Sequence, residues 1–346
     1  KHTTRLSKRW KMKQITIRKP NDFHHHLRDG DILSFTTEHC FKNFKHVIVM
    51  PNLLPPVTTI KQARDYKERI TQNNIYNGNP MMTLYFNKDL QESELRSIKD
   101  NPFIYGIKYY PKNATTNSKF GIETIESVFH ILKIMEEENI PLLIHGESIQ
   151  INVDIFDKEK VFIENELTKI ISNFPRLRIV LEHISTKESV DFVLKHDIHA
   201  TITPHHLLLD RNDIFRNGIN PHLYCLPILK RNNDKLALVE AAISGKKNFF
   251  LGTDNAPHTE TSKLTSCGCA GIFNSPVSVE LVTQIFSECN ALHNLEQFMS
   301  TNGCDFYKLP YNDEYITLKK EEWTVPLKYK NIVPLYSGKT IQWKQV

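Results

Sequence analysis

The chain has 346 residues, and its 40% hydrophobic and 24% charged composition is typical of a soluble globular protein rather than a disordered one. A formal net charge of +5 is too small to indicate nucleic-acid binding, and no apolar run approaches the roughly 20 residues of a membrane-spanning helix. The six cysteines are mostly scattered, so we expect no disulfide framework and a reducing, cytoplasmic setting.

Residues 1–13 are basic and contain no acidic residue, which predicts a disordered lead-in, with the remnant of a targeting sequence as the alternative. No internal repeat or low-complexity linker interrupts the remainder. We therefore expect residues 14–346 to form one domain.

Short apolar runs alternate with longer amphipathic segments along the chain. Eight runs are predicted as strands: Ile15–Arg18, Val47–Met50, Thr83–Phe86, Ile104–Tyr109, Leu142–His145, Ile179–His183, Ala200–Thr203 and Phe249–Thr253. Several lack polar alternation, as is typical of parallel strands covered by helices. Helices are predicted over 59–73, 92–99, 122–138, 157–172, 186–195, 234–244, 276–289 and 295–300.

Eight strand–helix alternations favour an α/β fold, a (β/α)8 TIM-like barrel. An open doubly wound sheet is the alternative, but no glycine-rich turn follows the first strand. Residues 204–231 are too many for a simple connection, so we expect them to fold over the site. After Leu309 the pattern loosens, and residues 314–318 with 339–343 predict a small C-terminal β appendage.

The stretch FHHHLRD after the first predicted strand contains the first candidate site. Alternate side chains of an extended backbone share a face, so His24 and His26 point together while His25 points away. Two imidazoles at this spacing form half of a metal site, and Arg28 adds a positively charged guanidinium on the same side.

Reactive side chains recur at the other predicted strand ends, where barrel enzymes carry their active sites. Lys108, His145, His183 and Asp254 lie there, and the second strand ends at Pro51-Asn52. Imidazole and carboxylate ligands suit Zn²⁺ or a similar divalent ion. Lys108 is unexpected among metal ligands; it either carries a CO₂-derived carbamate or pairs with an aspartate or the substrate.

Together these motifs resemble the dihydroorotases of the amidohydrolase superfamily, most closely their single-function bacterial-type class. The resemblance extends from about residue 14 to the C-terminus. It rests on FHHHLRDGD, VIVMPNLLPPVTT, IKYYPKNATTNS, PLLIHGE, EHISTK, ATITPHH, PHLYCLPILKR, LGTDNAPH and SCGCAG. The PHLYCLPILKR and GTDNAPH stretches are specific to this family.

The resemblance implies a reversible cyclisation of N-carbamoyl-L-aspartate to L-dihydroorotate in pyrimidine synthesis, by a bridging hydroxide on two Zn²⁺ ions with Asp254 as general acid/base. The implied metal ligands are His24, His26 and Asp254 for one zinc, His145 and His183 for the other, and Lys108, as N6-carboxylysine, for both. The implied substrate-binding residues are Arg28, Asn52 and His258 for the carboxylate, Leu226 and Ala270 for the ring amide, and Thr115 and Thr116 on a loop that closes over the substrate. A homodimer is also implied.

Three alternatives stay open in the sequence. A dihydropyrimidinase- or allantoinase-like enzyme would share the metals but not the carboxylate clamp, and a silent scaffold homologue would lack activity. A mononuclear deaminase is disfavoured by Lys108. We expect His205 and His206 to be supporting or loop residues rather than ligands, and Cys225 to lack a neighbouring base. We expect Cys267 and Cys269 to lie in a tight turn.

Overall fold

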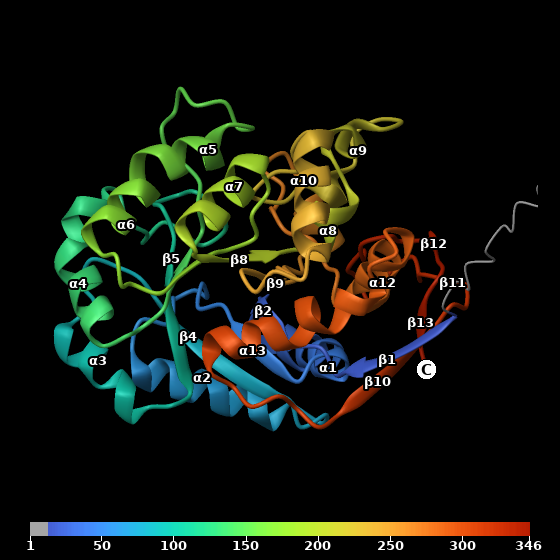
Figure 1. Cartoon of the computed structure of the whole chain (residues 1–346), viewed down its shortest axis with the longest axis horizontal. Helices are drawn as coiled ribbons and strands as arrows, with labels where there is room; N and C mark the ends of the chain where they lie inside the picture. Colours follow the sequence, from blue (N-terminus) through green and yellow to red (C-terminus); the bar gives the residue numbers. More distant parts are fainter. Residues whose placement is uncertain (1–12) are drawn as a thin grey trace, which may run out of the picture.

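The computed structural model describes residues 13–346, so all of the predicted lead-in except Lys13 lies outside the described residues. Eight parallel strands form one sheet in the order β2-β3-β4-β5-β6-β7-β8-β9 (Figure 1). They are β2 (Asp22–His25), β3 (His46–Val49), β4 (Asn79–Tyr85), β5 (Ile104–Tyr109), β6 (Leu142–Ile144), β7 (Ile179–Leu181), β8 (His199–Ile202) and β9 (Phe249–Leu251).

Hydrogen bonds between the first and last strands bring the sheet round into a barrel. The His26 N–H donates to the Asn255 carbonyl at 3.0 Å, and the Asp254 N–H donates to the His24 carbonyl at 2.8 Å. The predicted (β/α)8 barrel is therefore confirmed, with seven of its eight strands close to their predicted positions.

The first predicted strand is confirmed as a strand, but its predicted place in the barrel was wrong. Gln14–Arg18 forms β1, which pairs antiparallel with β10 (Tyr315–Lys319) at the edge of the molecule, outside the barrel (Figure 1). Its alternating pattern reflects a strand with one solvated face, and only Ile17 is fully buried. The true first barrel strand, Asp22–His25, is buried throughout but rich in polar residues, so its hydropathy did not reveal it.

Helices connect the strands and surround the barrel (Figure 1). They are α1 (Leu33–Asn43), α2 (Ile60–Gln72), α3 (Glu92–Arg96), α4 (Phe129–Glu137), α5 (Lys158–Phe162), α6 (Thr168–Asn173), α7 (Lys187–His196), α8 (Pro204–Leu208), α9 (Arg211–Phe215), α10 (Asn232–Ile243), α11 (Glu260–Lys263), α12 (Ser278–Glu288) and α13 (Asn302–Tyr307). Short 3-10 or π turns occupy Gly30–Ile32, Ile98–Asp100, Ile125–Val128, Ile163–Leu167, Pro221–Leu223, Leu292–Asn294 and Gln297–Thr301. None of the helices within residues 13–346 is long and apolar enough to cross a membrane.

Local signals explain several helix boundaries. Thr59 and Gln62 form a capping box at the start of α2, and the Thr186 side chain caps α7 by accepting from the Ser189 N–H. Helix α1 was not predicted, because its apolar residues are mixed with threonine, histidine and lysine.

The predicted C-terminal β appendage is confirmed, and its strands belong to two small antiparallel sheets. Strand β10 pairs with β1 and with β13 (Lys344–Gln345). Residues Thr340–Ile341 form β12, which pairs with β11 (Trp323–Thr324) in a separate two-stranded sheet. The two predicted segments therefore lie in different sheets, one of which includes β1.

The interior of the barrel is apolar below the site. Side chains from six strands form one cluster with α13, in which the rings of Phe23 and Tyr307 stack at 5.5 Å and Phe23 meets Phe250 edge-on at 5.1 Å. The β2–β3 register shifts between Asp22 and His25. Such irregularities redirect side chains beside active sites, and here the strand passes from apolar Phe23 to the histidines of the site.

Candidate active site

A cavity at the carboxyl ends of the barrel strands collects most of the predicted site residues. It is lined by His24, His26, Arg28, Asn52, Tyr110, Thr115, Thr116, His145, His183, Leu226, Asp254, Ala256, Ala270 and Gly271. Of the predicted residues, only Lys108 and His258 are outside this lining. Both lie next to it, as described below.

The first group of metal-type donors comprises His24, His26 and Asp254. Their donor atoms all lie within 4.8 Å of one another, and Asp254 Oδ1 is 3.1 Å from His26 Nε2 and 3.4 Å from His24 Nε2. The His24 Nδ1–H donates to Glu182 at 2.9 Å, which leaves Nε2 free to face the cavity. Burial lowers the pKa of His26 to about 3, so this imidazole is neutral, as a ligand must be.

The second group is a pair of buried histidines. His145 Nδ1 and His183 Nε2 lie 3.1 Å apart, while His145 Nε2 contacts Glu147 at 2.7 Å. Two nitrogens bound to one tetrahedral Zn²⁺ lie about 3.3 Å apart, given Zn–N bonds of roughly 2.0–2.1 Å. Burial lowers the pKa of both imidazoles, that of His183 strongly. Both rings are therefore uncharged at neutral pH, so neither has to give up an imidazolium proton before it binds a cation.

Lys108 lies on β5 and is completely buried. Its Nζ has no hydrogen-bond partner, and within residues 13–346 it forms no ion pair, so the predicted alternative of a lysine paired with aspartate is not observed. Burial lowers the pKa of Lys108 to about 8, against the opposing charges of Glu182 and Asp254. A buried amine without a hydrogen-bond partner is costly, and here the Tyr110 ring, whose centroid lies 4.6 Å from Nζ, offers a cation–π contact but no carboxylate or carbonyl acceptor.

A second set of side chains forms the opposite wall. An Arg28 Nη donates to His258 Nε2 at 3.0 Å, and the same ring nitrogen lies 3.0 Å from the Ala270 carbonyl. Because Nε2 cannot accept and donate at once, the ring tautomer selects one of these two bonds. Burial and the charge of Arg28 lower the pKa of His258 to about 3.

The loop that carries Thr115 and Thr116 lies against this wall. The Asn52 side-chain amide donates to the Thr116 carbonyl at 3.1 Å, and Asn117 donates back to the Asn52 carbonyl at 2.9 Å. The Thr116 hydroxyl donates to the Ala270 carbonyl at 3.4 Å. These bonds hold the loop at the edge of the cavity.

Three site residues have strained backbones. Arg28, His183 and Asp254 adopt φ values of 61°, 39° and 47°, in the left-handed region that non-glycine residues rarely occupy. Such strain persists only where the surroundings impose it and is concentrated at functional sites. Here it directs a guanidinium, an imidazole and a carboxylate into one cavity.

The residues that orient the ligands and complete the walls were not predicted from the sequence. Glu182 and Glu147 hold His24 and His145, and Tyr110, Ala256 and Gly271 line the cavity. A signal was present for the two carboxylates. Glu147 comes two residues after His145, and Glu182 directly precedes His183, although the histidine that it holds is His24.

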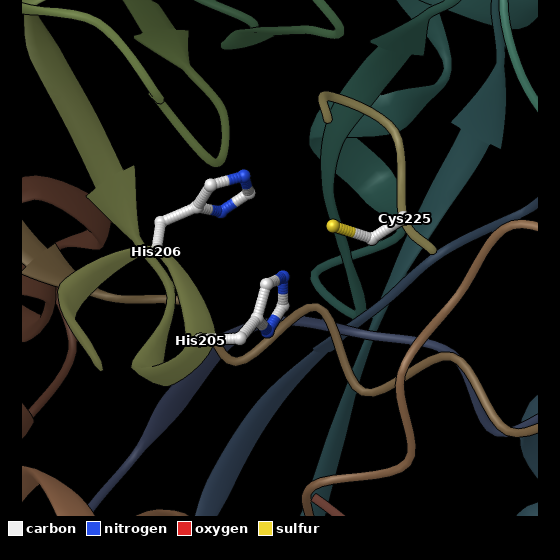
Figure 2. Close-up of side chains that lie close together, drawn as sticks. All are labelled: His205, His206 and Cys225. Carbon is white, nitrogen blue, oxygen red and sulfur yellow. The ribbon is translucent and has the colours of Figure 1, made fainter. Parts of the chain in front are cut away.

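A second cluster of ligand-type residues lies near the site. His205, His206 and Cys225 point toward one another (Figure 2), with their donor atoms within 4.8 Å. Two imidazoles therefore lie near Cys225, although its thiol donates to the Pro227 carbonyl and not to either ring. Burial nevertheless raises the pKa of Cys225 to about 12, which opposes formation of a nucleophilic thiolate.

Hydrogen bonds indicate that this cluster supports the fold. The Asn274 amide, oriented by a 2.7 Å bond to a carbonyl, donates to His205 Nδ1 at 3.3 Å, so the His205 proton lies on Nε2 and blocks that atom as a ligand. His206 Nε2 and the Cys225 thiol both donate to the Pro227 carbonyl, at 2.9 and 3.3 Å. The cluster thus anchors the turn that carries Leu226.

An eight-stranded parallel barrel with these donors at its carboxyl end defines a metal-dependent amidohydrolase. No protein-family profile matches the chain. The dihydroorotase of Coxiella burnetii is 47% identical over 96% of this chain and 98% of its own, and that of Acaryochloris marina is 49% identical over 96% and 99%. The chain belongs to the dihydroorotase family, whose members are hydrolases acting on cyclic amides.

Solved structures agree with this assignment. A Saccharomyces cerevisiae dihydroorotase in complex with 5-fluoroorotic acid has a TM-score of 0.90 at 31% identity, covering 97% of this chain and 99% of that one. A Campylobacter jejuni dihydroorotase has a TM-score of 0.88 at 36% identity, covering 96% and 97%. An Arthrobacter aurescens L-hydantoinase, with a TM-score of 0.83 at 16% identity, covers 96% of this chain and 83% of its own and shares the fold.

Proposed function

We propose that this chain interconverts N-carbamoyl-L-aspartate and L-dihydroorotate. One observation carries the proposal: two groups of buried nitrogen and oxygen donors line a cavity that also presents Arg28, and the buried Lys108 amine beside it has no hydrogen-bond partner. The donors suit amide hydrolysis, and the guanidinium suits a substrate that bears a carboxylate.

The donor groups fit two Zn²⁺ ions. His24, His26 and Asp254 would hold one, and His145 and His183 the other. The neutral Nζ of Lys108 would add to CO₂, forming an N–C bond and releasing a proton, to give N6-carboxylysine, whose carboxylate would be a ligand for both ions. When bound, such ions polarise a carbonyl and make water a better nucleophile near neutral pH.

Asp254 is positioned to move the proton. In ring opening it would take one proton from the attacking water and deliver it to the ring nitrogen as the C–N bond breaks, which gives a terminal ureido NH2 group. The new carboxyl group would ionise and release the second proton of the water. The cyclising direction reverses these transfers. Burial alone would raise the pKa of Asp254, but the hydrogen bond with His26 holds it well below its usual range. The carboxylate is therefore ionised and ready to accept.

The opposite wall would bind the substrate. Arg28, with Asn52 and His258 beside it, would hold the substrate carboxylate, because a planar guanidinium makes two parallel bonds to such a group. Leu226 and the backbone of Ala270 would contact the ring amide. Thr115 and Thr116 would close over it from the loop that Asn52 anchors. We also propose a cytoplasmic homodimer.

A substrate comparison tests the proposal. The zinc- and bicarbonate-treated protein is assayed with L-dihydroorotate and with hydantoin and dihydrouracil, which share the cyclic amide but lack the carboxylate. We expect turnover of L-dihydroorotate only. Turnover of hydantoin alone would indicate the dihydropyrimidinase-like alternative, and no turnover with near-zero bound metal would indicate a silent scaffold.

A further inference from the structure

Lys263 is a buried lysine outside the catalytic cavity. It ends α11, is 5% exposed, and forms no ion pair within residues 13–346. Its ammonium instead donates to three backbone carbonyls, those of Tyr224 at 2.7 Å, Cys269 at 2.9 Å and Gly271 at 2.8 Å. A lysine ammonium has three donors, so all of them are used.

The three carbonyls belong to the two segments that form one wall of the cavity. Tyr224 lies two residues before Leu226, while Cys269 and Gly271 flank Ala270, and Leu226, Ala270 and Gly271 line the cavity. One ammonium therefore connects two backbone segments that are more than 40 positions apart in the sequence. A 2.9 Å bond from the Gly271 N–H to the Tyr224 carbonyl joins them a second time.

The contact with Cys269 sets the direction of the next amide group. In a trans peptide the C=O and the following N–H point in opposite directions, and the 269–270 bond is trans. Because the Cys269 carbonyl points to Lys263, the Ala270 N–H points away from it. Among residues 13–346 this N–H has no protein acceptor, so it is free to donate to a bound molecule.

Close packing leaves this wall little freedom to adjust. A Cβ at Gly271, where φ is +147°, would lie 2.5 Å from the Ala256 carbonyl oxygen, and a Cβ at Gly268 would lie 2.7 Å from the Lys263 carbonyl oxygen. Burying an ammonium without a carboxylate is unfavourable unless its donors are satisfied. The wall satisfies them with main-chain oxygens only.

We propose that Lys263 is a positioning residue that fixes the Leu226 and Ala270 segments, and so the free Ala270 N–H, for binding of the substrate ring amide. The inference rests on the proposed function. It assigns Lys263 to substrate affinity and specificity, not to proton transfer, because its ammonium bonds only to backbone.

The test compares Lys263→Met with Lys19→Met. Lys19 is similarly buried, at 7% exposure, and its Nζ donates to the Phe41 carbonyl at 3.1 Å and pairs with Glu314 at 3.4 Å, and none of these residues lines the cavity. We expect Lys263→Met to raise KM for L-dihydroorotate at least 10-fold while kcat changes less than 3-fold. Lys19→Met should lower thermal stability and leave KM unchanged.

Further measurements separate positioning from folding. In Lys263→Ala, n-propylammonium replaces the deleted atoms and should lower KM, whereas tetramethylammonium, which has no N–H, should not. Hydrogen exchange of residues 264–272 should accelerate in both Lys263 variants. If Lys263→Met does not fold, the effect of n-propylammonium on the KM of Lys263→Ala decides whether Lys263 positions this wall.

The possible failures are distinguishable. An inactive wild-type enzyme would refute the proposed function, and with it this inference. An active wild type with an unchanged KM in folded Lys263 variants, or a KM increase of equal size in Lys19→Met, would overturn the role of Lys263 alone.

Discussion

Glu182 should control metal affinity although it is not a proposed ligand. Its carboxylate is 1% exposed and accepts from His24 Nδ1 at 2.9 Å and from the Thr201 hydroxyl at 2.6 Å. Glu182→Gln keeps the shape but removes the charge. A buried hydrogen bond to a charged group contributes about 1.5–3 kcal/mol, which corresponds to a loss of about 10- to 150-fold in metal affinity.

This range agrees with the roughly 10- to 100-fold effect of removing the partner that orients a metal-binding histidine. Competition between the protein and a fluorescent chelator measures the dissociation constants for Zn²⁺ in wild type and Glu182→Gln. Glu136→Gln is the matched control, because Glu136 is also buried, at 8% exposure, but lies on α4 and pairs with Lys133. Unchanged Zn²⁺ affinity in Glu182→Gln, or equal weakening in Glu136→Gln, would refute the reasoning.

Other changes have defined outcomes. Arg28→Lys loses the two parallel hydrogen bonds to the substrate carboxylate, so kcat/KM for L-dihydroorotate should fall about 10-fold or more in steady-state assays. An unchanged kcat/KM would exclude this role of Arg28. Gly271→Ala forces a side chain into a left-handed backbone and to within 2.5 Å of a carbonyl oxygen, so both the melting temperature and substrate affinity should drop; wild-type values would show that the wall can relax. The metal-free protein should lose stability in acid. Burial lowers the folded-state pKa of His206 to about 4, so only the unfolded state gains protons as pH falls below about 6.5. His206 alone should then lower the free energy of unfolding, measured by urea denaturation, by about 1.4 kcal/mol between pH 8 and 5.5. His258, with a pKa of about 3, should lower it by up to a similar amount. A free energy of unfolding that does not change with pH would contradict neutral buried imidazoles.

The barrel was predictable because most of its strands are continuous apolar runs. The exception shows the limit of hydropathy. Strand β2 carries Asp22, His24 and His25, which are buried because they bond to one another and to residues that follow other barrel strands. His25 contacts Asp22 at 2.7 Å, and the Thr253 N–H, just after β9, donates to Asp22 at 2.8 Å. Polar residues that satisfy each other across a fold look like a loop in sequence, whereas the exposed β1 looks like a strand.

The location of the site was predicted better than the contacts within it. Residues at strand ends must converge in a barrel, so His145, His183 and Asp254 were placed together by topology alone. Contacts between distant loops follow no such rule. The approach of Lys263 to Tyr224, and of His205 to Cys225, depends on how residues 204–231 fold over the barrel.

Lys108→Ala tests the central claim most directly, with bound metal and turnover of L-dihydroorotate measured on the same sample. The buried, unpartnered Nζ of Lys108 is proposed to become the bridge between two metal ions. We expect two Zn²⁺ per chain and activity in wild type, and less than one Zn²⁺ per chain with no detectable turnover in the variant. Full activity with two bound ions in Lys108→Ala would contradict the account.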